Sequence, residues 1–135
     1  MVNLKAVSED AIRSVVEAYY HAMVAGDEAA LRQVFDPEAR FQGWRDGSEV
    51  RRDLDAFAAM LQTPYDGEAH TEWRIDLVDR TGPVAIVRVV DWFRGRYYTD
   101  YLTLAQRNGA WIIVNKCFYA HHADAKGIDD LGGDA

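Results

Sequence analysis

Apolar residues in the first part of the chain recur with the helical period. From Ser8 to Gly26 they occupy positions 12, 15, 16, 19, 20 and 23, the stripe of an amphipathic helix. Ser8 suits the N-cap of this helix, and Gly26 ends it. Asp27 caps a second, short helix that ends at Asp36-Pro37, and the pattern predicts a third helix from Val50 to Gln62.

Beyond Pro64 the apolar positions alternate, and alternation predicts strands. Four runs have this pattern, after a shorter extended piece over 39–44: they span 69–79, 84–93, 97–106 and 111–119. Asn108-Gly109, between the last two, favours a type I′ hairpin turn because both turn positions need a positive φ. Helices followed by an antiparallel meander indicate an α+β fold.

The Asn108-Gly109 turn also predicts a register for the last two strands if no bulge intervenes. Asp100 then lies on one face opposite Cys117, and Tyr101 lies on the other face opposite Lys116. Each face is largely apolar and holds one charged group, Asp100 or Lys116. We therefore expect the helices to cover one face and a second subunit to cover the other, in a homodimer through the open sheet face.

Composition narrows the class of protein. The 135 residues carry a net charge of -7 and no basic run longer than Arg51-Arg52, so nucleic acid is not an expected partner. The single cysteine, Cys117, excludes an intrachain disulfide and suits a reducing compartment. No apolar run approaches the roughly 18 residues of a membrane span. We predict a cytoplasmic protein with one domain over 1–123 and a flexible acidic tail over 124–135.

Two polar residues within apolar stripes are the candidate catalytic groups. Tyr19 is central in the first helical stripe, either as a pocket hydroxyl or as a core tyrosine bonded to a strand carbonyl. Asp100 interrupts an apolar strand face, so it is either a general acid or base beside a cavity or an ion-pair anchor. Asp91 has a similar position, but its place near a strand end predicts solvent exposure.

Aromatic residues on the predicted inner faces suggest an apolar pocket, although core packing explains each of them individually. The candidate ligand-binding residues are Trp44, Phe57, Trp73, Tyr98, Tyr101, Lys116 and Phe118. Lys116 either holds an anionic ligand or forms a salt bridge across the dimer interface, and we favour the interface. The histidines have no metal-ligand spacing and no nucleotide-binding motif is present, so we expect neither a metal nor a cofactor.

Two segments resemble a known superfamily. One is Tyr19–Asp27 (YYHAMVAGD) with its continuation to Phe41, and the other is Thr99–Leu104 (TDYLTL) continuing through Asn108–Lys116 (NGAWIIVNK) to Phe118. They are similar to the nuclear transport factor 2-like superfamily, which includes ketosteroid isomerase, scytalone dehydratase and the SnoaL-like cyclases. The second segment is most similar to the subgroup labelled "Putative lumazine-binding". The resemblance implies a cone in which three N-terminal helices pack on a curved, mainly antiparallel sheet.

The resemblance also implies roles for individual residues. Tyr19, seven residues before Gly26, matches the tyrosine that hydrogen-bonds the oxyanion in ketosteroid isomerase, and the second oxyanion acid falls near Asp100 or Tyr101. The position of the isomerase base is Gly43, so that route lacks its base. We therefore expect a ligand-binding protein with a pocket for a small apolar or aromatic molecule. The alternative is a cofactor-independent isomerase, dehydratase or cyclase in which Asp100 moves a proton and Tyr19 stabilises the oxyanion.

Overall fold

A computed structural model describes residues 4–132 of the chain. Within that range the elements are α1 (Leu4–Ala25), α2 (Glu28–Val34), β1 (Phe35–Arg45), β2 (Ser48–Asp53), α3 (Leu54–Leu61), β3 (Trp73–Thr81), β4 (Val84–Phe93), β5 (Arg96–Arg107) and β6 (Ala110–Ala120). The strands form one sheet in the order β2-β1-β6-β5-β4-β3. Neighbouring strands are antiparallel except β1 and β6, which are parallel.

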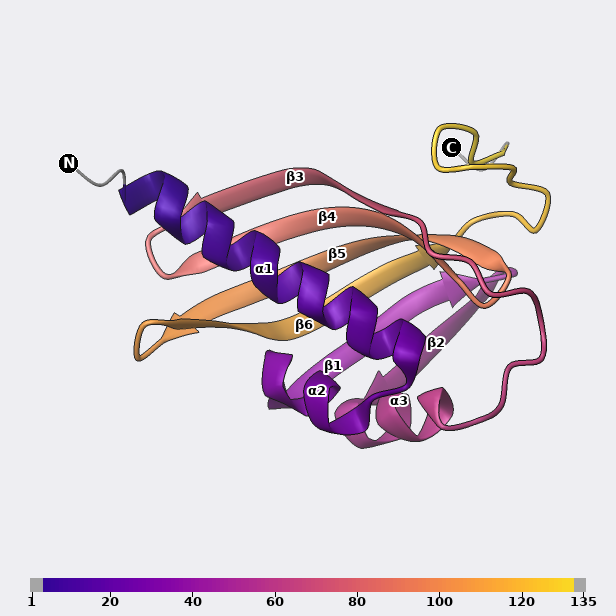
Figure 1. Ribbon diagram of the computed structural model, residues 1–135, viewed down its shortest axis with the longest axis horizontal. Coiled ribbons are helices and arrows are strands. Elements are labelled where there is room, and N and C mark those ends of the chain that lie inside the picture. The colour runs from indigo at the N-terminus through magenta and orange to yellow at the C-terminus, as the bar shows by residue number, and fades with distance from the viewer. Residues whose placement is uncertain (1–3, 133–135) are drawn as a thin grey trace.

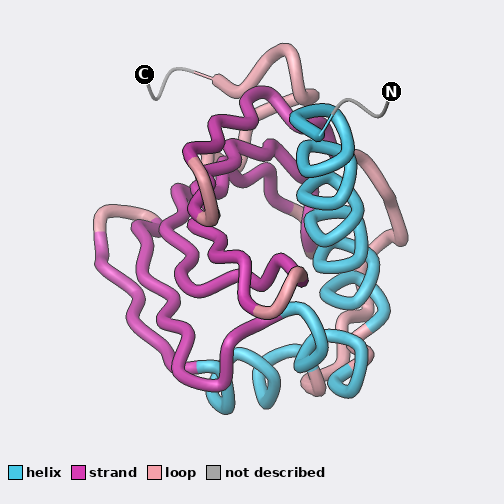
Figure 2. Tube along the Cα trace, turned by 90° about the vertical axis from the view of Figure 1, so that its left-hand side faces the viewer, coloured by secondary structure: helices cyan, strands magenta, loops and turns pink. Residues whose placement is uncertain are grey.

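The sheet is curved, and the helices lie on its inner face. Figure 1 shows α1 crossing the strands obliquely, with α2 and α3 beside β1, and Figure 2 shows the strands bending around the side occupied by α1. Side chains from the helices and from the inner face of the sheet form one buried core, in which Tyr19, Phe35, Phe41, Leu102 and Ile113 are at most 2% exposed. The predicted α+β class, with helices packed on a mostly antiparallel sheet, is confirmed.

The first two helices differ from the prediction at their ends. α1 already begins at Leu4, so Ser8 lies inside the helix and is not its N-cap. The reason is that leucine, lysine and alanine, which precede Ser8, are strong helix formers. Asp27 caps α2 as predicted, because its Oδ1 accepts a hydrogen bond from the Ala30 N–H at 3.1 Å. α2 ends at Val34, and Asp36-Pro37 lies within β1.

The predicted helix from Val50 to Gln62 is wrong in its first part. Asp46 and Gly47 have φ values of 52° and 80°, so they form a tight turn that folds β2 back onto β1. Backbone pairing with β1 therefore holds this segment extended as far as Asp53. α3 begins only at Leu54, where the Asp53 side chain accepts a hydrogen bond from the Ala56 N–H at 2.8 Å.

A bulge in β6 overturns the predicted register of the last hairpin. Asn108-Gly109 forms the expected turn, and Arg107 pairs with Ala110, but the register shifts between Thr103 and Leu104. Beyond the shift Leu102 pairs with Lys116, whereas Tyr101 pairs with Cys117. Lys116 therefore lies on the inner face of the sheet, the same face as Asp100. The expectation that each face holds one of these two charges was wrong, because one additional residue in a strand exchanges its two faces.

The segment after β6 contacts the end of the sheet. Gly127 and Asp130 form an isolated bridge, and Arg74 donates a hydrogen bond to Asp129 at 2.5 Å. Residues 133–135 of the predicted tail lie outside the described range. None of the helices within 4–132 is long and apolar enough to cross a membrane. The single-domain organisation, the flexible tail and the cytoplasmic location stay predictions.

Candidate functional site

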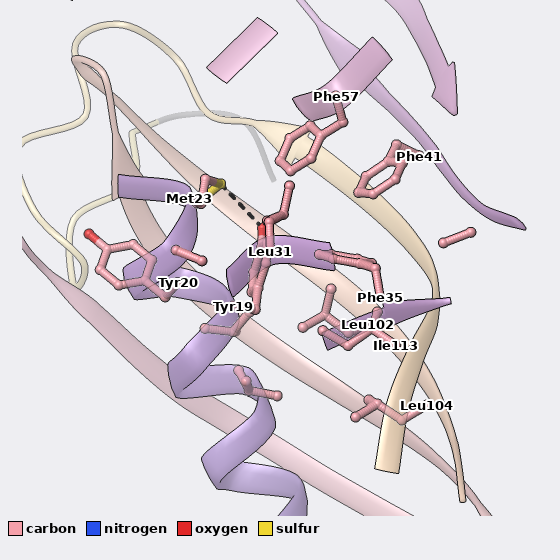
Figure 3. Close-up of a cluster of buried hydrophobic side chains, with 14 of the residues drawn as sticks. Tyr19, Tyr20, Met23, Leu31, Phe35, Phe41, Phe57, Leu102, Leu104 and Ile113 are labelled. Carbon is pink, nitrogen blue, oxygen red and sulfur yellow. Dashed lines mark hydrogen bonds between the residues drawn. The ribbon is translucent and has the colours of Figure 1, made fainter. Parts of the chain in front are cut away.

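Tyr19 and Asp100 meet at the centre of the inner face. The Tyr19 hydroxyl donates a hydrogen bond to Asp100 Oδ2 at 2.7 Å, and both residues are fully buried. The same hydroxyl lies 3.5 Å from the sulfur of Met23, a contact seen in Figure 3. Because a hydroxyl carries one proton and sulfur is a weak acceptor, the carboxylate is its principal partner. Burial, followed by the charges of Asp100 and Asp91, raises the pKa of Tyr19 well above 10.0, so Tyr19 remains a donor.

Lys116 extends this cluster from β6. Its side chain is nearly buried, and Nζ lies 3.9 Å from Asp100 Oδ2. Nζ also lies 5.1, 4.7 and 5.3 Å from the ring centroids of Tyr19, Phe57 and Phe118. Aromatic faces attract a cation and partly replace the water that an ammonium loses on burial. The structure therefore places Lys116 in an internal ion pair, where we had favoured a surface interface.

Asp91 is the residue whose environment we predicted incorrectly. It is 1% exposed, although its position near the end of β4 suggested contact with solvent. Its charge acts on Tyr19 and Tyr20 of α1, so Asp91 faces the helix side of the sheet and not solvent. Asp91 pairs with Tyr98, and Val89 pairs with Asp100, so the two aspartates are diagonal neighbours on the inner face. Along β4, Asp91 lies on the same face as the buried residues Val87 and Val89, and this pattern could have identified it as buried.

The protonation of Asp91 follows from this environment. Neither of its oxygens accepts a hydrogen bond from any donor among the described residues. Burial raises the pKa of Asp91 well above 3.8, and the negative charge of Asp100 raises it further. Asp91 therefore holds its proton to a higher pH than an exposed aspartate does.

A cavity of about 320 Å³ opens beside this cluster, between the end of α1, α3, β1, β2, β6 and the adjoining ends of β4 and β5. Its apolar lining comes from Met23, Val50, Phe57, Met60, Phe93 and Phe118, and its polar lining from Arg45, Arg52, Thr63, Asp91, Arg94, Tyr98 and Lys116. At the wall, Arg45 donates a hydrogen bond from Nη1 to the Tyr98 hydroxyl at 2.8 Å. Burial raises the pKa of Tyr98, against the opposing effect of Arg45 and Arg96.

The structure brings together only part of the predicted site. Four predicted ligand-binding residues line the cavity, and Tyr19 and Asp100 lie behind its wall and contact it through Lys116. The cavity-lining ones are Phe57, Tyr98, Lys116 and Phe118.

Three other predicted ligand-binding residues lie away from the cavity. Trp44 and Tyr101 are on the outer face of the sheet, where they are 50% and 42% exposed. They alternate along their strands with the inner-face residues Gly43 and Asp100, so the pleat directs them outward. Trp73 stacks on Tyr20, with ring centroids 5.9 Å apart, and does not line the cavity.

Gly43 occupies the position where the resemblance implies an isomerase base. A Cβ at this position would lie 2.4 Å from the backbone oxygen of Phe118 and 2.5 Å from its ring. The strand pairing of Gly43 with Phe118 brings the two backbones together, and the ring fills the remaining space. An acidic side chain therefore has no room at position 43. If this cavity carries an acid or base, Asp91 on β4 is the residue that can present it.

A sequence model of the family described as "Putative lumazine-binding" matches residues 7–119. The chain belongs to this family. An NTF-2 like protein of unknown function from Silicibacter pomeroyi is 30% identical, with a TM-score of 0.79, and the match covers 90% of this chain and 100% of that one. Membership of the nuclear transport factor 2-like superfamily is thereby shown, as the sequence predicted.

More distant solved structures share the fold of this family member. An NTF2-like protein of unknown function from Methylobacillus flagellatus is 24% identical, with a TM-score of 0.74 and coverage of 90% of this chain and 96% of that chain. A protein from Novosphingobium aromaticivorans named "Putative Scytalone Dehydratase" is 17% identical, with a TM-score of 0.68 and coverage of 90% and 89%. Comparison with curated proteins finds no match.

Proposed function

We propose that this protein binds a small, largely apolar and planar molecule in the cavity beside Asp91. The observation that carries the proposal is the unpartnered carboxyl of Asp91 at a wall otherwise rich in aromatic rings. A buried acid without a partner costs free energy that a ligand hydrogen bond recovers. The cavity volume of about 320 Å³ lies in the range of small-molecule sites, which combine apolar walls with few polar groups.

Filling the cavity tests this proposal without knowledge of the natural ligand. The uncharged probe N-phenyl-1-naphthylamine fluoresces when it enters an apolar site, so we expect saturable binding to the wild-type protein. Val50→Trp places a large ring in the cavity wall and should abolish that binding. Val7→Trp is the matched control, because Val7 is 52% exposed on α1 and does not line the cavity. Equal binding by both variants, or none by the wild-type protein, contradicts the proposal.

A second candidate is cofactor-independent acid–base catalysis, of the kind that the name of the Novosphingobium protein suggests for that protein. The observation that favours it is the buried carboxyl of Asp91 at the cavity wall, since burial raises its pKa and a raised pKa keeps an acid able to donate a proton nearer neutral pH. In this candidate Asp91 contacts the substrate. The predicted catalytic residues Tyr19 and Asp100 lie behind the cavity wall and do not contact the substrate. The Tyr19 hydrogen bond and the Lys116 ion pair hold the carboxyl group of Asp100 beside Asp91.

Proton exchange at a carbon acid tests the catalytic candidate. In D₂O the protein should accelerate the exchange of the α-protons of 2-tetralone, followed by proton NMR. Asp91 donates its proton to the ketone oxygen while a solvent molecule removes the α-proton, and the resulting enol takes deuterium from the solvent at carbon as its O–H proton returns to the carboxylate of Asp91. Asp91→Asn should reduce the exchange to the buffer rate while the near-ultraviolet circular dichroism remains native. Asp79→Asn, at an exposed position on β3, is the control and should leave the rate unchanged. Wild-type exchange no faster than buffer contradicts catalysis of this type and leaves ligand binding intact.

We also propose a homodimer through the outer face of the sheet. That face carries large apolar side chains that are 38–50% exposed, namely Trp44, Leu77, Ile86, Tyr101 and Tyr119. Their burial between two copies removes apolar area from water. Light scattering at micromolar concentration should give a dimer mass, and Tyr101→Asp should give a monomer with unchanged circular dichroism. A monomeric wild-type protein contradicts the proposal.

A further inference from the structure

The cavity lining has a charge opposite to that of the protein. The chain as a whole carries a net charge of -7, yet four of the residues that line the cavity are cationic and one is acidic. The cations are Arg45, Arg52, Arg94 and Lys116, and the acid is Asp91. Four cations against one acid give the lining a net positive charge even where Asp91 is ionised.

Two of these cations are already engaged by the protein. Lys116 is buried against Asp100, as described above. Arg94 donates hydrogen bonds to the carbonyl oxygens of Met60 and Leu61, at 3.5 and 3.0 Å, and to the hydroxyl of Thr63 at 3.1 Å. These contacts satisfy carbonyl groups at the end of α3. Lys116 and Arg94 therefore contribute charge but few free donors.

Arg45 and Arg52 have donors to spare. They come from β1 and β2, and the register places both on the inner face, on either side of the Gly43–Val50 pair. Arg45 Nε is 4.0 Å from Asp46, but Asp46 bonds closely to Arg96, at 2.8 and 3.2 Å. Within residues 4–132 no ion pair or hydrogen bond engages the guanidinium of Arg52, although that side chain is half-buried.

An arginine in this position suits one class of ligand group. A guanidinium presents a planar fork of donors that matches a carboxylate or phosphate, and it binds neutral groups less strongly. At the inner end of the cavity, Lys116 is already paired with Asp100, and the remaining charged residue of the lining there is the acidic Asp91, so an anion gains no free cation. An anionic group is therefore directed to the mouth, and an apolar ring is directed inward, beside Phe57 and Phe118.

We infer that the ligand is an organic acid: a planar apolar body with one oxyanion that binds Arg52, assisted by Arg45, at the mouth of the cavity. This inference rests on the proposed ligand-binding function and adds the chemical class of the ligand. Arg52 is the residue that determines specificity, because it has no competing partner. Arg45 supports it while it holds the Tyr98 hydroxyl in place.

Isothermal titration calorimetry with two matched probes tests the inference. 2-Naphthoate and 2-naphthamide have the same ring system and differ in charge. We expect the wild-type protein to bind the naphthoate about ten-fold more tightly or better, the usual advantage of a charge-assisted pair. Arg52→Gln should remove that advantage and leave naphthamide binding unchanged. 2-Naphthyl phosphate, measured alongside, distinguishes a phosphate site from a carboxylate site.

Arg51→Gln is the matched control. Arg51 is the neighbouring residue on β2, it is exposed, and it pairs with Gln42 and not with an inner-face residue. The substitution changes the net charge by the same amount and should preserve the preference for the naphthoate. Equal affinity of both probes in the wild-type protein, or equal losses in Arg51→Gln and Arg52→Gln, overturns the inference while the proposed ligand-binding function stands. Failure of the wild-type protein to bind either probe or N-phenyl-1-naphthylamine contradicts the ligand-binding function itself.

Discussion

Asp91→Asn should make the protein less sensitive to rising pH. Burial and the neighbouring Asp100 raise the pKa of Asp91 in the folded protein, whereas the unfolded chain gives this group an ordinary pKa of about 3.9. Between these two pKa values the folded state holds a proton that the unfolded state has released. The contribution of Asp91 to stability therefore falls as the pH rises from about 4 through the folded pKa, and it is constant above that.

The size of the effect follows from one linked proton. A full proton of difference gives a slope of about 1.4 kcal/mol in the free energy of unfolding per pH unit. For a chain of this length that is a fall in Tm of roughly 5 °C per pH unit. Asparagine has almost the same shape and no titrating proton, and its amide N–H can donate to the Asp100 oxygen that lacks a partner. The variant should therefore lose this slope and be the more stable protein at pH 7.

Thermal unfolding followed by circular dichroism from pH 4.5 to pH 8 measures this difference. The wild-type and Asp91→Asn curves should diverge as the pH rises, and Asp79→Asn, with its exposed side chain, should parallel the wild-type curve. Parallel curves for wild type and Asp91→Asn would show that Asp91 titrates normally. Burial beside Asp100 would then not raise the pKa of Asp91.

Three further substitutions test how the site is held in place. Lys116→Met leaves the buried Asp100 without its cation and should destabilise the fold by about 3 kcal/mol or more in urea unfolding at pH 7; a cost below about 1 kcal/mol contradicts the ion pair. Asp53→Ala removes the cap of α3 and should cost about 1 kcal/mol by the same method, with no loss expected if the cap is unimportant. Gly43→Ala directs a methyl group against Phe118 and should cost about 1–3 kcal/mol, read as a lower Tm; an unchanged Tm contradicts the close approach.

The sequence predicted correctly those strands and turns that depend only on residues close together in the chain. The alternation from Val84 to Phe93 and the Asn108-Gly109 turn gave β4 and the last hairpin almost to the residue, since both depend on neighbours in the chain. The prediction of a helix from Val50 to Asp53 was wrong because the apolar spacing of this segment also fits a helix. Its pairing with β1 depends on the Asp46-Gly47 turn, and Asp-Gly is itself a hairpin signal.

The candidate site was only partly predictable for a related reason. A charged residue on an apolar strand face shows that something unusual is buried there, and that signal identified Asp100. The same signal applies to Asp91, which lies on the apolar face of β4. We predicted exposure for Asp91 because it is near the end of that strand. Which groups share a cavity depends on how α1 and α3 cover the sheet, and on long-range contacts that no local pattern encodes.

The bulge in β6 connects these observations. Without the extra residue, Lys116 would lie on the outer face, and the inner face would hold Asp91 and Asp100 with no cation beside them. Burial penalises each negative charge and the two charges oppose each other, so two buried carboxyl groups without a cation are costly to hold ionised. With Lys116 on the inner face, its Nζ lies 3.9 Å from Asp100 Oδ2 and offsets that charge. A single inserted residue thus places a cation beside the buried aspartates, next to the residue that lines the cavity, Asp91.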